Sequence, residues 1–192
     1  MPEFRLETVR LILRDWRESD WEPFFRHTNT PAVMRWLGGP ADEATRDKIR
    51  QRLPLAAEEH GHCFWVVERK PDGGHLAGEL LGFCGLKRAN MAGGPIGDFE
   101  IGWRFREDAW GRGYAKEAAI ASLDAGFGQF TAPEIIALTV AENTASWGLM
   151  ERLGMRRRAE LDFRCPDFLP DRDTIVYSIG RDDWVGARAA AA

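Results

Sequence analysis

The stretch that most constrains the fold is Trp110-Gly111-Arg112-Gly113-Tyr114-Ala115, which leads into a pattern typical of a helix. Two glycines one residue apart allow backbone conformations that are closed to other residues, and they let a ligand come close to the backbone. After the turn, small and apolar residues recur at helical spacing, at Ala115, Ala118, Ala119, Leu123 and Phe127. A glycine turn that opens a helix presents unpaired N–H groups at the positive end of the helix dipole. The stretch therefore predicts a site for a phosphorylated cofactor, with a plain tight turn before a surface helix as the alternative.

The spacing of this turn excludes two common phosphate-binding loops. A P-loop ends in Gly-Lys-Ser or Gly-Lys-Thr, and neither follows the glycines here. A dinucleotide-binding G-x-G-x-x-G motif favours a small residue where Lys116 stands, and it opens a βαβ unit near the start of its domain. This turn instead follows several segments with strand patterns, past the midpoint of the chain. The cofactor is therefore expected to be of another kind.

Composition limits the classes of protein to consider. The chain has 192 residues, 44% of them hydrophobic and 29% charged, as expected of one globular domain. A net charge of −4 argues against a broadly basic nucleic-acid binder, although Arg156-Arg157-Arg158 leaves a local basic patch open. No apolar run approaches the ~20 residues that span a bilayer, and the first residues lack the plan of a signal peptide. The three cysteines are widely spaced and suggest neither a disulfide framework nor a metal site, so we expect a reducing, cytoplasmic location.

Hydrophobic periodicity predicts the elements before the turn. Ser19 and Glu22 have the spacing of a capping box, so a helix is expected from there to about Thr28. A second helix is expected from about Glu43 to His60, kinked or split at Pro54. Strands are predicted at residues 8–14, 63–69, 78–87 and 98–105.

The elements after the turn follow the same rules. A β-branched run at 135–140 predicts a buried strand, and Asn143 is expected to cap a helix that Gly154 ends. Two last strands are predicted at 158–165 and 174–180, and residues 186–192 are expected to be a disordered tail. The result is one α/β domain with a mixed sheet.

Five motifs in order carry a resemblance to a known family. They are the opening Glu7–Arg14 segment with the Ser19-Asp20 helix start, the Phe99-Glu100-Ile101-Gly102-Trp103 strand, the glycine turn, the Asn143–Ser146 segment with Leu153-Gly154-Met155, and the closing Tyr177–Trp184 segment. Together they resemble the GNAT superfamily of acetyltransferases, and more narrowly its RimJ/RimL-type branch. The resemblance covers residues 7–185, which implies a single GNAT domain. It implies about six to seven strands flanked by about four helices, with the sheet splayed between the strands near residues 98–106 and 134–141.

The resemblance implies acetyl-CoA as co-substrate, and no metal. The N–H groups of Gly111, Arg112, Gly113, Tyr114 and Ala115 would cradle its pyrophosphate, with the Arg112 side chain as a further phosphate contact. The pantetheine arm would pair with the edge of the strand that carries Ile101, Trp103, Phe105 and Arg106, and Asn143 would contact it from the opposite side.

The expected catalytic residues are Glu100 and Ser146. Glu100 lies on the strand that leads to the turn, where members of the superfamily often carry a catalytic glutamate, and it is the candidate base; Asp98 and Glu79 are weaker alternatives. Many members place a proton-donating tyrosine seven residues after the asparagine, but this chain has Met150 there, and a thioether cannot donate a proton. Either that role is vacant or Ser146 fills it.

The acceptor stays open at the level of sequence. The resemblance implies a primary amine, either a protein N-terminal α-amine, with ribosomal proteins among the candidates, or a small amine or amino acid. Trp36, Trp65 and Trp103 are candidate linings of the acceptor pocket, whereas His60 and His62 lack a third metal ligand nearby. A non-catalytic acetyl-CoA- or CoA-binding module, a longer acyl donor, and a monomer or a homodimer all remain open; no direct nucleic-acid or membrane partner is expected.

Overall fold

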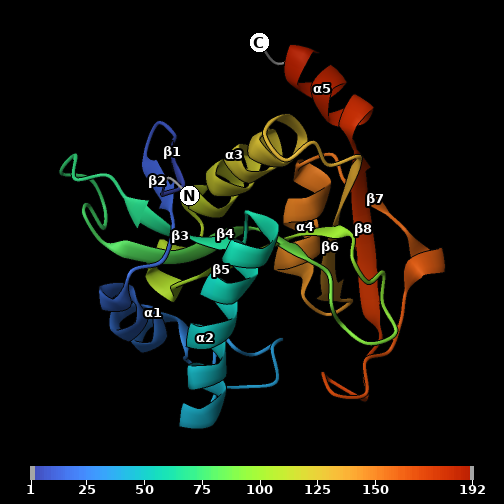
Figure 1. Ribbon diagram of the computed structural model, residues 1–192, viewed down its shortest axis with the longest axis horizontal. Helices are drawn as coiled ribbons and strands as arrows, with labels where there is room; N and C mark the ends of the chain where they lie inside the picture. Colours follow the sequence, from blue (N-terminus) through green and yellow to red (C-terminus); the bar gives the residue numbers. More distant parts are fainter. Residues whose placement is uncertain (1–2, 191–192) are drawn as a thin grey trace. The chain divides into compact units, whose positions relative to one another are not determined.

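The strands hydrogen-bond in the order β1-β2-β3-β4-β5-β6-β8-β7 in the computed structural model, which describes residues 3–190 (Figure 1). In this part of the chain, eight strands and five α-helices form a mixed α/β sheet fold, which confirms the predicted fold class with one strand and one helix more than expected. The contacts divide the chain into two compact units. The first contains the residues up to Lys87 together with Gly102–Ser122, and the second contains Arg88–Ile101 and the residues from Leu123 onward.

The first unit holds the antiparallel part of the sheet and the two N-terminal helices. Its elements are β1 (Arg5–Glu7), β2 (Leu11–Arg14), α1 (Trp21–Thr28), α2 (Glu43–His60), β3 (Phe64–Arg69), most of β4 (Leu80–Arg88), the end of β5 (Phe99–Phe105) and the start of α3 (Tyr114–Gly128). Strands β1, β2, β3 and β4 pair antiparallel with their neighbours, with Leu13 opposite Leu6 on one side and opposite Val67 on the other.

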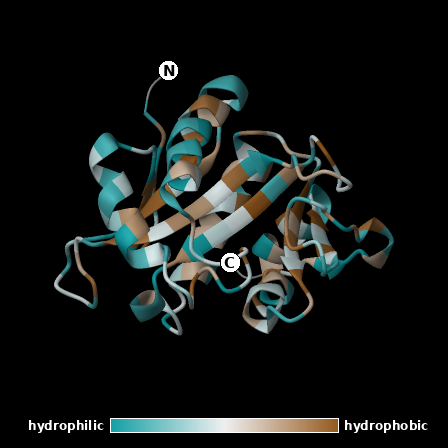
Figure 2. Ribbon diagram, turned by 90° about the horizontal axis from the view of Figure 1, so that it is seen from below, coloured by the Kyte–Doolittle hydropathy of each residue, from teal (hydrophilic) through white to brown (hydrophobic). Residues whose placement is uncertain are grey.

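Two layers of helix cover the sheet of the first unit. Strand residues alternate between faces: Phe83 of β4 packs with Phe24 of α1 and Leu53 of α2 in one core, whereas its neighbour Cys84 contacts Ser122 of α3. The Ser122 Oγ–Cys84 Sγ distance is 3.6 Å. In Figure 2 the central strands are largely brown and white, the colours of apolar and neutral residues.

The second unit is built on a long antiparallel pair of strands. Its elements are the start of β5, the end of α3, β6 (Glu134–Val140), α4 (Thr144–Arg152), β7 (Arg156–Arg157), β8 (Thr174–Gly180) and α5 (Arg181–Ala190). All seven residues of β6 pair with β8, and the start of β5 pairs with β6 in parallel, with Glu100 opposite Ile136. The recorded β5–β6 ladder covers Phe99–Ile101, and the predicted splay beyond it stays a prediction.

Several sequence predictions at the N-terminus need correction. The strand predicted at 8–14 is shorter, since Thr8, Val9 and Arg10 form the connection of a hairpin between β1 and β2. The predicted Ser19 capping box is wrong as well. It is the Asp20 carboxylate that accepts a hydrogen bond, from the Arg17 N–H at 2.7 Å. Helix α2 has the predicted bounds, and Pro54 does not split it.

Two further corrections concern the C-terminal part. The strand predicted at 158–165 is replaced by the two-residue β7 and a 3₁₀ turn at Ala159–Leu161. The tail predicted to be disordered from residue 186 is helix α5 as far as Ala190, and the rest of the alanine run lies outside the described residues. Trp184 anchors this helix, because its Nε1 donates to Asp124 Oδ1 at 2.9 Å and its ring lies near Phe127. Hydrophobic periodicity did not predict α5, because the helix buries one residue, Trp184, and one residue gives no repeating pattern.

Candidate active site

The glycine turn before α3 has the backbone geometry that its sequence predicts. Gly111 and Gly113 have φ angles of 71° and 77°, in the left-handed region that side chains disfavour. A Cβ at Gly111 would meet nothing within 4 Å, and at Gly113 only the end of the Arg10 side chain at 3.5 Å. Glycine is therefore required at these two positions by the positive φ angle, and a side chain would not clash with neighbouring atoms.

The turn leaves a run of backbone donors without acceptors. The N–H groups of Gly111, Arg112, Gly113, Tyr114 and Ala115 donate no hydrogen bond to any residue between 3 and 190, whereas the N–H of Glu117, two residues after Ala115, bonds to Gly113 O at 3.0 Å. Such donors at the N-terminus of a helix bind phosphate oxygens well. This arrangement fits the pyrophosphate of the expected cofactor, which the sequence pattern had placed here.

A partly buried carboxylate fixes the start of α3 to the β1–β2 connection. Glu117 accepts hydrogen bonds from Thr8 Oγ1 at 2.6 Å, Arg10 N at 2.8 Å and Arg10 Nε at 2.7 Å. Burial works to raise the pKa of Glu117, but these hydrogen bonds and the Arg10 charge hold it below its ordinary value. Arg10 also donates to Arg112 O at 3.0 Å, so the same side chain neutralises Glu117 and holds the turn.

Tyr114 ties the turn to β3. Its ring is buried, with the guanidinium of Arg10 4.6 Å and that of Arg69 5.7 Å from the ring centroid. Its hydroxyl donates to His75 O at 3.2 Å and accepts from Arg69 Nε at 3.3 Å. Tyr114 was predicted to contribute its backbone to the cofactor site, and its side chain has this separate anchoring role.

The residues at the end of β5 lead directly into the turn. Phe105 is buried, Trp103 is partly buried, and Trp110 Nε1 donates to Phe105 O at 2.9 Å. Arg106 was expected at the cofactor, but it is buried and fully engaged. Its guanidinium bonds to Asp108 Oδ1 at 2.6 Å and Glu79 Oε2 at 3.1 Å, and its N–H bonds to Leu81 O at 2.9 Å.

Strands β4 and β5 approach closely at one point. A Cβ at Gly82 would lie 1.9 Å from Arg104 O, a distance that no side-chained residue could accept without moving the backbone. The glycine therefore sets the position of the β5 segment that precedes the turn.

The other predicted site residues lie in the second unit. Glu100 and Ile101 are buried on β5. Asn143 stands at the N-cap position of α4, but the predicted side-chain cap is absent. Its Nδ2 instead donates to Thr139 Oγ1 at 3.1 Å. Ser146 is partly buried in the first turn of α4, and within residues 3–190 its hydroxyl has no hydrogen-bond partner.

No phenol replaces the missing tyrosine within the second unit. Met150 is buried at 1% exposure, as a core residue of α4. The chain has two tyrosines: Tyr114 belongs to the first unit, and the hydroxyl of Tyr177 in the second donates to Glu151 Oε1 at 3.4 Å. Burial and the Glu151 charge raise the pKa of Tyr177, which makes it a weaker acid still.

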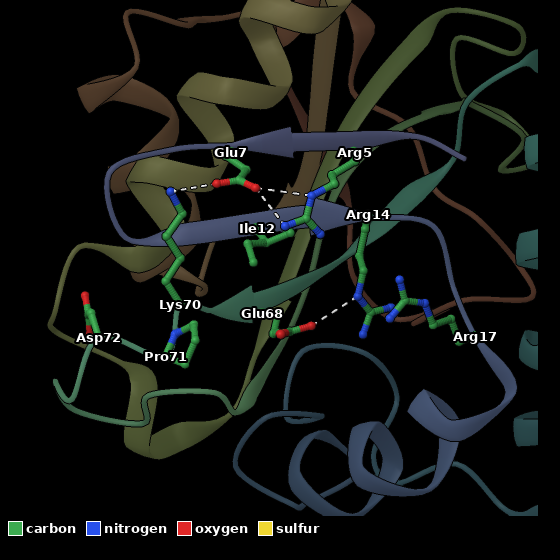
Figure 3. A pocket seen from close by; sticks show the side chains of 9 residues that line it. All are labelled: Arg5, Glu7, Ile12, Arg14, Arg17, Glu68, Lys70, Pro71 and Asp72. Carbon is green, nitrogen blue, oxygen red and sulfur yellow. Dashed lines mark hydrogen bonds and ion pairs between the residues drawn. The ribbon is translucent and has the colours of Figure 1, made fainter. Parts of the chain in front are cut away.

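Potential metal ligands and a charged hollow are the other features that could form a site. Among residues 3–190, no cluster of three or more potential metal ligands occurs, and the buried His62 Nδ1 lies 3.2 Å from Leu86 O. A shallow hollow beside β1, β2 and β3 is lined by charged side chains (Figure 3). Its charges are largely paired with one another: Glu7 contacts both Arg5 and Lys70, and Glu68 contacts Arg14. It therefore offers a ligand little free charge.

Sequence reasoning missed the residues that support the turn. Thr8, Arg10, Arg69 and Glu117 come from β3, α3 and the connection after β1, and each is an ordinary polar residue in its own segment. Only the fold brings them together, so no local pattern identifies them.

A family model described as an acetyltransferase (GNAT) domain matches residues 10–156, which include the turn, Arg10, Arg69 and Glu117 of its support, and the predicted catalytic residues. The family model and the fold define an acyltransferase of the acetyl-CoA-dependent class. The chain belongs to the GNAT family of acetyltransferases.

Relatives and solved structures agree with this assignment. The chain is 27% identical to an uncharacterized N-acetyltransferase of Bacillus subtilis, YnaD, over 93% of this chain and 98% of the relative. It is 33% identical to an FsC-acetyl coenzyme A-N(2)-transacetylase of Aspergillus fumigatus, over 94% of this chain and 77% of the relative. A GNAT-family acetyltransferase structure from Bacillus anthracis matches with a TM-score of 0.73 and 27% identity, covering 93% of this chain and 99% of that one.

A more distant structure shares the fold alone. The ribosomal-protein-S5-alanine acetyltransferase of Vibrio fischeri matches with a TM-score of 0.70 at 18% identity, covering 94% of this chain and 98% of that one.

Among the described residues, no helix is both long and apolar enough to cross a membrane.

Proposed function

We propose that this protein transfers the acetyl group of acetyl-CoA to a primary amine by direct attack in a ternary complex. The observation that carries the proposal is the row of unpaired backbone donors from Gly111 to Ala115, at the start of α3. Family membership supplies the class of reaction, and these donors supply a place for the cofactor phosphates.

The cofactor contacts follow from the turn and the strand before it. The N–H groups of Gly111 to Ala115 would hold the pyrophosphate, and Arg112, which is exposed, would add a cationic contact. Ile101, Trp103 and Phe105 would offer the edge of β5 to the pantetheine arm, and Asn143 would contact it. The Arg106 guanidinium and N–H are already paired, and its carbonyl accepts from Ala109 N at 3.1 Å, so its part would be limited to a second hydrogen bond at that carbonyl. When bound, acetyl-CoA supplies an acetyl group activated as a thioester.

The acceptor must lose a proton before it can attack. A lysine-type amine has a pKa near ~10.4 and an α-amine near ~8. To make the amine neutral at neutral pH, the site must therefore lower the pKa of an α-amine by about two units less than that of a lysine-type amine. A buried carboxylate on β5 suits the role of base, and Glu100 is our candidate. Ser146 is the candidate proton donor to the departing thiolate, because its hydroxyl has no partner among the described residues. A thiol ionises near ~8.5, so the departing group needs only modest assistance.

The finer features of the proposal come from the sequence resemblance. They are a RimJ/RimL-type branch, an acceptor that is a protein N-terminus (ribosomal proteins included) or a small amine or amino acid, a cytoplasmic location, and a monomer or homodimer. The neighbour from Vibrio fischeri is consistent with the branch, but at 18% identity it supports the fold only.

The proposal is tested by measuring CoA release from acetyl-CoA with a thiol-reactive dye. The acceptors are free amino acids, polyamines, aminoglycosides and peptides with free N-termini. We expect at least one productive acceptor and, for Glu100→Gln, a rate loss of about a hundredfold or more, in the range of general-base catalysis. Glu18→Gln, a substitution of the same kind at an exposed position, should keep the wild-type rate. A wild-type rate for Glu100→Gln would remove Glu100 from the mechanism.

A second function is favoured by one observation. Met150 is a core residue where many family members place a tyrosine, and Tyr177 is hydrogen-bonded to Glu151. A non-catalytic acetyl-CoA- or CoA-binding module would tolerate this loss. Acetyl-CoA binding by calorimetry with no turnover of any acceptor would favour this reading, whereas turnover of a single amine would eliminate it.

A further inference from the structure

The buried and partly buried arginines of the first unit differ in whether a carboxylate pairs with them. Arg14 contacts Asp20 and Glu68, Arg69 contacts Asp72, and Arg106 contacts Asp108 and Glu79, so each buried guanidinium has a carboxylate. Arg104 on β5 is partly buried and has no carboxylate or hydrogen-bond partner in the described chain. Buried charges are normally paired, so Arg104 is the exception that needs a reason.

Aromatic rings hold the Arg104 guanidinium in place. Its Cζ lies 5.6 Å from the centroid of Phe24 of α1 and 5.4 Å from that of Phe83 of β4. Phe83 is stacked on Phe64 at 4.7 Å, so the ring beneath Arg104 is itself fixed. Arg104 Nε is closed off from solvent without a partner, whereas the two terminal nitrogens are not. The terminal N–H groups of Arg104 are therefore accessible to a ligand, while the phenylalanine rings hold the guanidinium in place.

The electrostatic surroundings of Arg104 are positive. Burial, together with the charge of Arg52 on α2, lowers the pKa of Arg104 to about 10. Arg52 is exposed and likewise forms no ion pair among residues 3–190. The positive charge of Arg52 thus acts on Arg104 from a different element, and no carboxylate of the described chain pairs with either guanidinium.

We infer that Arg104 recognises a carboxylate on the acceptor, so that the preferred substrates are amines that carry a carboxylate, such as free amino acids. A guanidinium fork matches the two oxygens of a carboxylate. Polyamines and aminoglycosides, which bring several positive charges, would be repelled.

This inference rests on the proposed function and narrows it. Arg104 belongs to the same strand, β5, whose edge is assigned to the pantetheine arm, and it lies one residue before the end of that strand. A substrate held at Arg104 would therefore be held by the strand that also positions the cofactor. Arg104 is a specificity residue in this scheme and takes no part in proton transfer.

The kinetic test compares each free amino acid with its own amide as acceptor. The two acceptors share a side chain, and the amide lacks the carboxylate. Because the amine of the amide is also the less basic one and is more often neutral, a preference for the acid does not come from the amine. We expect wild-type kcat/KM to favour the acid by about tenfold to a hundredfold, the range of a charge-assisted hydrogen-bonded pair. Arg104→Met should abolish this preference by raising KM for the acid, with kcat little changed. Arg104→Lys, which keeps the charge and loses the fork, should fall between the two.

Arg46→Met is the matched control. Arg46 also lies over a phenylalanine, with its Cζ 5.9 Å from the Phe25 centroid, but it is paired with Glu43 at 2.9 Å. Its removal should leave the ratio of acid to amide unchanged. Thermal unfolding separates a role in binding from a structural one. Removing an unpaired, partly buried charge should leave the melting temperature of Arg104→Met equal or higher, whereas a structural role would lower it.

A binding measurement keeps the inference separate from the proposed function. Calorimetry with 3-phenylpropionate, which has a carboxylate and a ring but no amine, should show binding to wild type and at least tenfold weaker binding to Arg104→Met. Such binding without turnover of any amine would support the Arg104 site and contradict the transferase proposal. Turnover of amides as fast as acids, or equal 3-phenylpropionate binding by both proteins, would overturn the Arg104 site and leave the transferase intact.

Discussion

Two places in the first unit have hydrogen-bond donors without acceptors, and they reach that state differently. At the glycine turn the donors are backbone N–H groups, held by positive φ angles at Gly111 and Gly113. The charged side chains that support the turn are paired, as Arg10 is with Glu117. At Arg104 the donor is a single side chain, held between Phe24 and Phe83, and no carboxylate balances it.

The difference predicts what each place can do. Exposed backbone donors are hydrated when no ligand is present, so the turn costs little stability and binds any suitably shaped anion. A guanidinium partly withdrawn from water is less well solvated, so it gains more from a fitting carboxylate and it discriminates against cations. The turn is suited to an invariant cofactor, and the Arg104 site to the choice of acceptor.

The largest effect is expected from Gly82→Ala, which disturbs the strand that leads to both places. The new Cβ would lie 1.9 Å from Arg104 O, in a residue whose φ is already 145°. Overpacking against backbone and conformational strain together should lower the free energy of unfolding by about 3 kcal/mol or more. Denaturant unfolding measures this loss.

Gly38→Ala is the control for that substitution. Gly38 has a φ of 87° and nothing within 4 Å of a Cβ, so it tests strain without a clash. A loss of about 1 kcal/mol is expected there. Equal losses for the two variants would show that the close approach of β4 and β5 is not a constraint.

The second effect separates the turn from Arg104. Gly113→Val places a β-branched residue at a φ of 77°, which should distort the donors and weaken acetyl-CoA binding by about tenfold or more. Binding of 3-phenylpropionate should not change. Gly97→Val, at a φ of 90° with open space around it, is the control and should bind acetyl-CoA normally. Undiminished acetyl-CoA affinity in Gly113→Val would contradict the assigned role of the turn.

The third effect is a pH dependence that arises at the support of the turn. The folded pKa of Glu117 is lowered, so its stabilising contribution is complete above its ordinary pKa of 4.5 and is lost as the pH falls through the folded value. Glu117→Gln should cost about 1–2 kcal/mol at pH 7. That difference from wild type should shrink on acidification below pH 4.5. Thermal unfolding of both proteins from pH 3 to 7 tests the trend, and a constant difference would contradict it.

The smallest effect is expected from Arg112→Ala. Arg112 is exposed, so a phosphate contact made by its side chain would be screened by solvent and salt. We expect a loss of a few fold in acetyl-CoA affinity at low salt that vanishes at high salt. A loss as large as that of Gly113→Val would shift the emphasis from the backbone donors to this side chain.

The sequence predicted the turn better than it predicted its surroundings. Glycine spacing and helix periodicity are local signals, so Gly111, Gly113 and the start of α3 were found correctly. Glu117 and Arg10, which hold the turn, are 107 residues apart and meet only through the fold. Arg104 could not be recognised at all, because the absence of a counter-charge is a property of tertiary structure.

The errors in secondary structure have the same origin. Thr8–Arg14 alternates like a strand, but only Leu11–Arg14 forms one, and the three residues before it form the connection that follows β1. Asn143 occupies its predicted cap position, yet its amide group bonds to Thr139, a neighbour that no rule for helix ends includes. Helix α5 depends on Trp184 and Asp124, which are 60 residues apart in sequence.

The most direct test of the central claim is an NMR titration with acetyl-CoA that follows the backbone amides of Gly111 to Ala115. If these donors bind the cofactor phosphates, their amide protons should shift downfield and saturate together, while the amide of Gly97, in the loop between β4 and β5, stays in place. Saturable binding that leaves the amides of Gly111 to Ala115 unshifted would contradict the assignment of the turn as the cofactor site.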